Sequence, residues 1–113
     1  MYEKGGVWMK LLTRTEEIYL LAILGLKDDA YGVQIKKQVA EISGKEISYG
    51  ALYFALEQLH NKGYVTRRHG VPTPVRGGCS KIYYKLSPEG KKSLKDAFAL
   101  HHSIWAGISV NSF

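Results

Sequence analysis

The chain has 113 residues, of which 45% are hydrophobic and 23% charged, and its formal net charge is +6. This length supports one domain with a modest core, and this composition excludes a wholly disordered chain. A single cysteine excludes an internal disulfide, and the longest mostly apolar run, residues 18–26, is only about half of a bilayer span.

Capping signals and helical spacing predict two helices after a short amphipathic N-terminal segment, residues 1–12. Thr13 with Glu16 forms a capping-box signal, and the apolar run that follows predicts a central, buried helix. Asp29 is expected to cap a second helix that ends at a serine-glycine stop signal. The apolar stripe of this second helix consists of Tyr31, Ile35, Val39 and Ile42.

A third helix is predicted over residues 47–62, which read ISYGALYFALEQLHNK. Ser48 is a good N-cap, because its side-chain oxygen can accept a hydrogen bond from a free N–H of the first turn. Gly63 suits the left-handed position past the helix end. The core-facing side consists of Leu52, Ala55, Leu56 and Leu59. The opposite side carries Gly50, Phe54, Glu57 and Asn61, with Tyr53 on the flank.

After the third helix the hydrophobic period changes to two, which predicts strands over residues 64–69 and 81–86. The residues between them are rich in glycine and proline, so we expect a hairpin with a long tip. Ile82, Tyr84 and Leu86 should share one face of the second strand. Residues 63–86 carry no acidic side chain, and their basic side chains are Arg67, Arg68, Arg76, Lys81 and Lys85.

Nearly all of the excess positive charge lies in residues 48–86, which hold six basic residues and one acidic residue. The segments before and after this stretch are nearly neutral. A localised basic region is typical of a nucleic-acid-binding surface. The alternative is a solvated surface, but such surfaces more often intersperse both signs of charge.

Ser87 and Pro88 predict the start of a last helix within residues 87–113. Its apolar stripe exceeds what the preceding domain of about 75 residues can bury. An unmatched apolar helix face usually indicates a partner, most simply the same helix of a second copy. The predicted dimer-interface residues are Leu94, Ala97, Phe98, His101, Ile104, Trp105 and Ile108.

Three helices followed by a basic hairpin predict a mostly helical α+β fold, a winged helix-turn-helix with an added C-terminal dimerisation helix. The expected divisions are an N-terminal amphipathic segment (1–12), a DNA-binding domain (13–86) and the dimerisation helix (87–113). In this plan the third helix enters the major groove of double-stranded DNA and the hairpin touches the backbone. A homodimer would bind two half-sites of a palindromic operator.

Four motifs occur in a fixed order across residues 13–92. They are Leu24 to Leu26 followed by YGVQI at 31–35, SYGALY at 48–53 with Leu56 and Leu59, GYV at 63–65, and YYKLS at 83–87 with Gly90. Together they resemble the PadR family of bacterial and archaeal transcription regulators. The resemblance is to the compact subfamily, in which one long helix mediates dimerisation and some members bind flat aromatic compounds between subunits. It implies a ligand-responsive repressor.

The sequence departs from the family pattern at three places. Phe54 stands where the family usually has proline, and Gln58 stands where it commonly has arginine. Cys79-Ser80 replaces a more basic or proline-containing wing tip. These changes concern operator recognition and not the fold.

Helices two and three and the hairpin supply the candidate DNA-binding residues. They are Lys36, Lys37, Ser48, Tyr49, Gly50, Tyr53, Asn61, Arg67, Arg68, Arg76, Lys81 and Lys85. Basic hairpin residues that neutralise phosphates make binding salt-dependent, whereas the alternative is a role in solubility. Tyrosine can donate to phosphate, asparagine can read adenine, and glycine permits close approach. The alternative role for Tyr53 is packing against a neighbouring helix. For Phe54 we favour packing on the hairpin over contact with thymine methyl groups.

Four aromatic residues are candidates for a ligand pocket between subunits: Trp8, Phe98, His101 and Trp105. Indoles stack on planar and cationic molecules, and the alternative is an ordinary dimer core. Cys79 is expected to be a plain exposed cysteine, with a redox switch as the alternative. The histidines lack the spacing of a metal site and no serine or cysteine has a nucleophile motif, so we expect no metal, no cofactor and no enzyme.

We therefore predict a cytoplasmic, dimeric, operator-specific DNA-binding regulator, a repressor that a small aromatic or cationic ligand releases. The alternative is a winged-helix module that binds a protein through the aromatic face of the third helix, without DNA. A weaker third hypothesis is a membrane-surface protein that uses the basic patch. No signal-peptide pattern opens the chain, and the apolar runs are too short for a membrane span.

Overall fold

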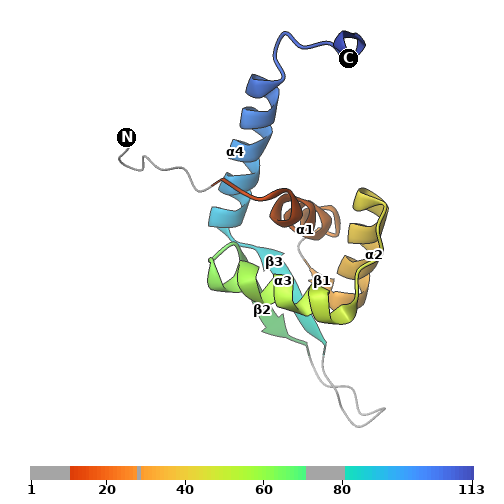
Figure 1. The fold of residues 1–113 in the computed structure, drawn as a ribbon. Helices are drawn as coiled ribbons and strands as arrows, with labels where there is room; N and C mark the ends of the chain where they lie inside the picture. Colours follow the sequence, from red (N-terminus) through yellow and green to blue (C-terminus); the bar gives the residue numbers. More distant parts are fainter. Residues whose placement is uncertain (1–10, 28, 71–80) are drawn as a thin grey trace.

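The computed structural model describes residues 11–27, 29–70 and 81–113. The elements follow one another as α1 (Arg14–Gly25), β1 (Ala30–Tyr31), α2 (Gly32–Ser43), α3 (Tyr49–Asn61), β2 (Val65–His69), β3 (Ile82–Leu86), α4 (Pro88–Ile104) and the 3-10 helix η2 (Val110–Ser112) (Figure 1). The strands form one antiparallel sheet in the order β1-β3-β2. The predicted mostly helical winged helix-turn-helix fold is confirmed. The predictions for Trp8, Arg76 and Cys79 fall outside the described residues.

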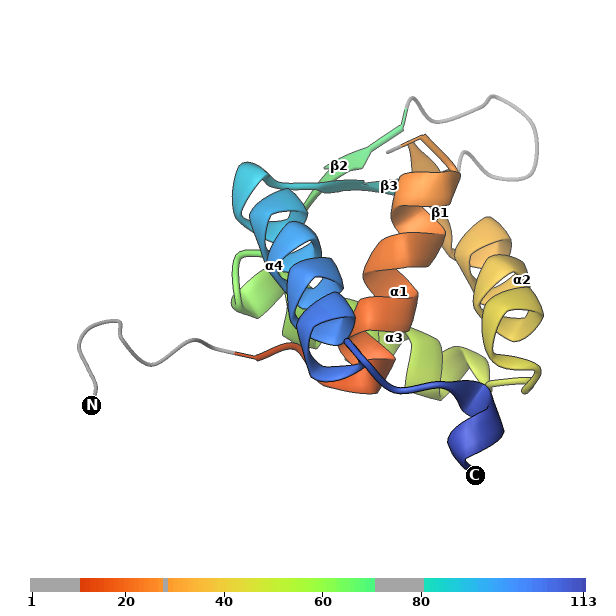
Figure 2. The same ribbon diagram turned by 90° about the horizontal axis from the view of Figure 1, so that it is seen from above.

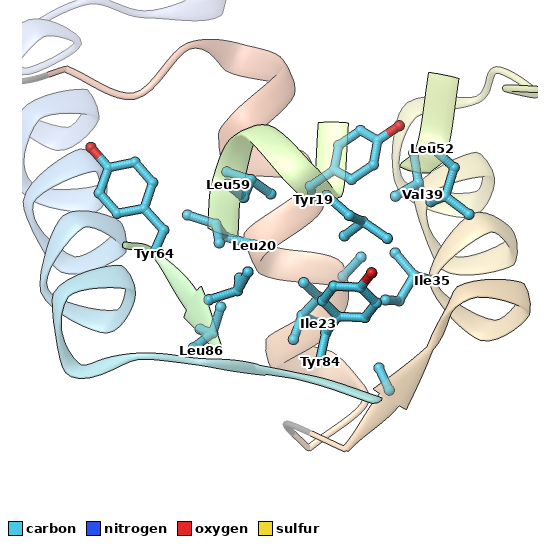
Figure 3. Close-up of a cluster of buried hydrophobic side chains, with 14 of the residues drawn as sticks. Tyr19, Leu20, Ile23, Ile35, Val39, Leu52, Leu59, Tyr64, Tyr84 and Leu86 are labelled. Carbon is cyan, nitrogen blue, oxygen red and sulfur yellow. The ribbon is translucent and has the colours of Figure 1, made fainter. Parts of the chain in front are cut away.

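The core is built around α1, which lies between α4 and α2 (Figure 2) and also contacts α3 and β3. Leu20 and Ile23 of α1 are fully buried. Figure 3 shows them in one cluster with Leu59 of α3 and Tyr84 of β3. Full burial of a side chain of this size contributes about 1.5–3 kcal/mol, so this cluster holds the helices against the sheet.

Polar side chains start three of the helices as predicted. The Thr13 hydroxyl accepts from the Glu16 N–H at 3.1 Å, and the Glu16 carboxylate accepts from the Thr13 N–H at 2.9 Å, which completes the capping box. Ser48 accepts from the Ala51 N–H at 3.1 Å at the start of α3. Ser87 accepts from the Gly90 N–H at 3.0 Å at the start of α4. Each bond satisfies an N–H that the first turn of a helix leaves free.

The end of α3 explains why β2 begins one residue later than predicted. Gly63 has a φ of +81°. Its N–H donates to the His60 carbonyl, and the Tyr64 N–H donates to the Leu59 carbonyl, both at 3.0 Å. This is a Schellman motif, in which Tyr64 closes the helix instead of starting the strand. Val65 is therefore the first residue of β2, and it pairs with Leu86 of β3.

The predicted start of α2 is wrong. Asp29 does not cap this helix, because residues 30 and 31 pair with β3 and form the short strand β1, with Ala30 opposite Tyr84. The N-cap is Tyr31, whose N–H donates to the side-chain oxygen of Gln34 at 3.2 Å. The buried stripe of α2 is also shorter than predicted, because Ile35 and Val39 are buried but Ile42 is 43% exposed.

Two predictions about apolar helix faces also need correction. The helix α1 is central but not buried all round, because Leu21 and Leu24 are 41% and 43% exposed. The helix α4 stops at Ile104, and Gly107 adopts a φ of +81° beyond it, so Ile108 does not continue the helical stripe. Leu94 is buried in the core of its own chain and is not available to a partner.

Candidate nucleic-acid interface

The outward face of α3 is exposed along its whole length. Leu52, Leu56 and Leu59 are buried, whereas Gly50, Glu57 and Asn61 are exposed on the other side, as predicted. Two tyrosines flank this face near its start, with exposed fractions of 49% for Tyr49 and 45% for Tyr53. A helix of this kind presents backbone, hydroxyl and aromatic groups to any partner that approaches.

The two tyrosines form an ordered pair with a lysine above it. Their rings stack with centroids 6.3 Å apart and an interplanar angle of 18°. The Lys36 ammonium lies 5.1 Å from the Tyr49 ring centroid, and it also pairs with Glu46 at 3.4 Å. A side chain at Gly32 would collide with the Tyr53 hydroxyl, so the Tyr53 ring packs closely on the start of α2. Packing against a neighbouring helix, the alternative for Tyr53, is therefore observed, although nearly half of the residue remains exposed.

The strands β2 and β3 form the wing, and its two faces carry different chemistry. Arg67 lies opposite Tyr84, whose ring is buried, so this face looks toward the core and α3. Arg68 lies opposite Tyr83 and belongs to the other face. On that face Tyr31 of β1 meets the Tyr83 ring edge to face at 5.8 Å. We call these three side chains, Tyr31, Tyr83 and Arg68, the outer row.

A cation lies over each of the two tyrosine rings of the outer row. The Arg68 guanidinium carbon lies 4.6 Å from the Tyr83 ring centroid, and the Lys81 ammonium lies 4.1 Å from the Tyr31 ring centroid. Stacking on a ring orders a long basic side chain without neutralising its charge. Lys37 and Lys85 are also exposed. The outer row and its cations thus form an ordered basic surface on the face of the sheet that points away from the core.

Carboxylates pair with both wing arginines, which the sequence did not suggest. The Arg67 Nη1 donates to the Glu57 carboxylate at 2.7 Å, and the Arg68 Nη2 donates to the Asp29 carboxylate at 2.5 Å. The hydrogen bond from Arg67 lowers the pKa of Glu57, and the same bond raises the pKa of Arg67. Asp29 and Glu57 are separated from their arginines by 39 and 10 residues, so only the tertiary structure reveals the pairs.

Asn61 is not grouped with the other candidates on α3. It lies at the last residue of the helix, 12 residues after Tyr49, which corresponds to about 18 Å along the axis. It lines a hollow with Tyr64 and with Glu89 and Lys92 of α4. The structure therefore separates the asparagine from the tyrosine pair.

The preferred prediction for Phe54, packing on the hairpin, is wrong for the described residues. Phe54 is 68% exposed and borders an apolar hollow of about 930 Å³. The other walls of this hollow come from α1, the end of α2 and the loop before α3, with Tyr19, Ile42 and Ile47 among them. Helical spacing turns Phe54 toward this side because Ala51 and Gln58, three before it and four after it, line the same hollow.

Among the predicted ligand residues, the three that the structure describes, Phe98, His101 and Trp105, do not converge within one chain. Phe98 is 75% exposed, and Trp105 contacts only the ring of Phe113 among the described aromatic residues, at 6.2 Å. His101 faces its own chain, since its Nε2 lies 3.1 Å from the Glu17 carboxylate of α1. The helix α4 therefore presents Phe98 and Ile104 outward, followed by its exposed C-cap Trp105, and Figure 1 shows its second half extending beyond the other helices.

The part of the chain that the structure describes meets the requirements neither of a metal site nor of a membrane-spanning helix. Residues 11–27, 29–70 and 81–113 contain no group of three His, Cys, Asp or Glu side chains placed to hold a metal ion. No helix in these same ranges is long and apolar enough to cross a membrane.

A family model described as the transcriptional regulator PadR-like family matches residues 20–96. No curated protein sequence matches the chain. Among solved structures, RosR of H. salinarum is 27% identical with a TM-score of 0.68, over 88% of this chain and 83% of RosR. A PadR family transcriptional regulator from Eggerthella lenta is 24% identical with a TM-score of 0.62, over 80% of this chain and 77% of the other. One from Clostridium difficile is 23% identical with a TM-score of 0.61, over 82% and 95%.

The last two similarities show a shared fold, and the family match covers β1, α2, α3, the wing strands and the first half of α4. These are the elements that carry the exposed tyrosine pair and the outer row. Regulators of this family bind DNA and are not enzymes. The chain belongs to the PadR-like family of transcriptional regulators.

Proposed function

We propose that the protein is a sequence-specific, dimeric transcriptional repressor whose α3 enters the major groove and whose outer row contacts the DNA backbone. The observation that carries the proposal is that one molecule presents both an exposed tyrosine pair on α3 and an ordered basic surface on the wing. Recognition helices read bases chiefly with their N-terminal residues. This rule favours Tyr49, Gly50 and Tyr53, with Ser48 at the edge of the groove, and gives Asn61 a peripheral place.

Phosphate contacts are assigned to Arg68, Lys81 and Lys85 of the wing and to Lys36 and Lys37 of α2. Stacking on Tyr83 and Tyr31 holds two of these cations in place before DNA arrives. Both partners of the Arg68–Asp29 pair are exposed, and Glu46 is exposed in its pair with Lys36, so each pair is weak and a phosphate can replace its carboxylate. Each phosphate that is neutralised steepens the dependence of affinity on salt.

Dimerisation is assigned to the outward residues of α4. Phe98, Ile104 and Trp105 are 75%, 59% and 53% exposed, and Leu21 and Leu24 add apolar surface on the neighbouring α1. Apolar residues gathered on a helix that extends beyond its domain usually find a partner. Two copies joined in this way would bind two half-sites of a palindromic operator.

A small aromatic or cationic inducer is proposed to bind between the subunits, beside Trp105 and Phe98. Support comes from the exposure of both rings, which leaves their faces free to stack on a planar molecule. Trp8 belongs to the same proposal from the sequence. Quenching of tryptophan fluorescence by a panel of flat dyes would support the pocket, and no quenching by any of them would oppose it.

The proposal is tested by titrating a duplex from the protein's own promoter region at several salt concentrations. The expected result is tight binding that competitor DNA does not displace and that weakens as salt rises. The second candidate function is a protein-binding module that uses the same exposed tyrosines and Phe54. Failure of the wild-type chain to bind DNA in a salt-sensitive way would favour that second function.

A further inference from the structure

The two neighbouring wing arginines differ in every contact that the structure provides. Successive residues of a strand point to opposite faces, so Arg67 shares its face with the buried Val65 and Tyr84. Arg68 belongs to the outer row. The Arg67 side chain is 33% exposed and the Arg68 side chain is 59% exposed. Equal charge and adjacent positions therefore do not imply equal roles.

Arg67 is held from two elements at once. Its Nη1 donates to the Glu57 carboxylate of α3 at 2.7 Å. Arg67 also lies directly opposite Tyr84 of β3, whose ring is only 3% exposed, and interaction with this side chain contributes to raising the pKa of Arg67. A planar guanidinium can bind two acceptors in fixed directions, which a lysine ammonium cannot do in the same way. The side chain thus links β2 to α3 and to the core.

We infer that Arg67 is a positioning residue, which with Glu57 and Tyr84 fixes the angle between the wing and α3, and is not itself a phosphate contact. This inference rests on the proposed function, because that angle matters only if both elements engage one DNA duplex. A fixed angle keeps the tyrosine pair in register with the groove while the outer row holds the backbone. Arg67 then contributes to the choice of sequence without touching a base.

The cost of the alternative role supports this assignment. To reach a phosphate, Arg67 would leave Glu57 as an unpaired carboxylate on the helix that approaches a polyanion, and it would give up the Tyr84 hydroxyl. The penalty is smaller for Arg68, because its pair with Asp29 is more exposed to water. Its carboxylate partner Asp29 lies before β1 and not on α3, and Arg68 also stacks on the Tyr83 ring.

The test compares matched substitutions in the full-length protein. The variants are Arg67→Gln, Arg67→Lys, Arg68→Gln and Arg68→Lys. Each is titrated against a duplex of mixed sequence and against a duplex enriched by the wild-type protein from a random pool, over a range of salt concentrations. The readouts are the salt slope on the mixed duplex and the affinity ratio between the two duplexes.

For a phosphate contact, neutralising the side chain lowers the salt slope by about 0.9, and lysine restores it. We expect this result for Arg68→Gln and Arg68→Lys. For Arg67→Gln we expect an unchanged slope on the mixed duplex and a reduced affinity ratio, and Arg67→Lys should not restore the ratio. Glu57→Gln should also reduce the ratio, because it replaces the charge-assisted hydrogen bond with Arg67 by a weaker bond to a neutral amide.

A slope that falls by about 0.9 in Arg67→Gln and returns in Arg67→Lys would overturn the inference, because it identifies a phosphate contact. An unchanged affinity ratio in both Arg67→Gln and Glu57→Gln would also overturn it. If the wild-type protein binds neither duplex in a salt-dependent way, the proposed function fails and the inference fails with it. Thermal unfolding of each variant is the control that the fold persists. Tyr84→Phe removes only the Tyr84 hydroxyl and should also reduce the affinity ratio between the two duplexes.

Discussion

Replacing Gly50 by alanine adds one methyl group, which should affect the affinity for DNA without reducing the stability of the fold. A Cβ at Gly50 would have the Ser48 Oγ as its nearest atom beyond its chain neighbours, at 3.8 Å, so it meets no steric barrier. Alanine in a helix is more stable than glycine by about 0.5–1 kcal/mol. We therefore expect Gly50→Ala to leave the unfolding temperature unchanged or to raise it.

The same methyl group points out from the face that we place in the groove. Where a protein surface is packed tightly, an added methyl group costs about 1–3 kcal/mol, which corresponds to a roughly 5- to 150-fold weaker affinity. Fluorescence anisotropy with a duplex enriched by the wild-type protein measures this loss. Gly25→Ala is the control, because its Cβ would meet only the Gln38 side chain at 3.9 Å, away from α3. Unchanged affinity in Gly50→Ala would refute close approach of DNA at this residue.

Three further predictions concern the fold and the dimer. Gly90→Ala should lower the unfolding temperature, because its Cβ would lie 3.1 Å from the Tyr64 carbonyl carbon and collide with the carbonyl oxygen. This overlap costs about 1–3 kcal/mol, which exceeds the gain in helix propensity. An unchanged unfolding temperature would contradict the packing of α4 on the wing domain. Leu94→Ala should destabilise the fold by about 2–4 kcal/mol at any protein concentration, whereas Phe98→Ala should spare the fold and weaken self-association in sedimentation experiments. Acidification should destabilise the protein through Glu16 and Glu57. Partial burial acts to raise the pKa of Glu16, but hydrogen bonds from Lys62 and Thr13 bring it below the ordinary value of 4.5, and Arg67 lowers the pKa of Glu57. A carboxyl group with a lowered folded-state pKa stabilises the protein above its unfolded pKa and loses that contribution as pH falls through the folded value. Urea unfolding of the double variant Glu16→Gln with Glu57→Gln should therefore depend less on pH below about 4.5, and an equal dependence would exclude these pairs as its source.

Local signals predicted the parts of the fold that depend on neighbouring residues. The capping hydrogen bonds join residues within one helical turn, and they are observed at Ser48 and between Thr13 and Glu16. The buried side of α3 followed from helical spacing for the same reason. The strand β1 was missed because two residues are too few to show an alternating hydrophobic pattern. Only their pairing with β3 identifies them as a strand.

The candidate site was predictable in its residues but not in its contacts. The sequence located the basic residues of the wing, yet it gave no reason to pair Arg68 with Asp29 or Arg67 with Glu57. It also placed Leu94 in a dimer interface, because a stripe on one helix does not reveal how much of it the same chain covers. Such contacts depend on the angle between elements, which the spacing of residues within one element does not fix.

Selection of duplexes from a random pool by the purified wild-type protein tests the central claim most directly. We predict enrichment of a palindromic sequence whose half-sites lie about one helical turn, or 10 base pairs, apart, and binding that weakens as salt rises. The claim would be contradicted by a pool that stays random after repeated rounds, or by enriched duplexes that bind equally well at every salt concentration.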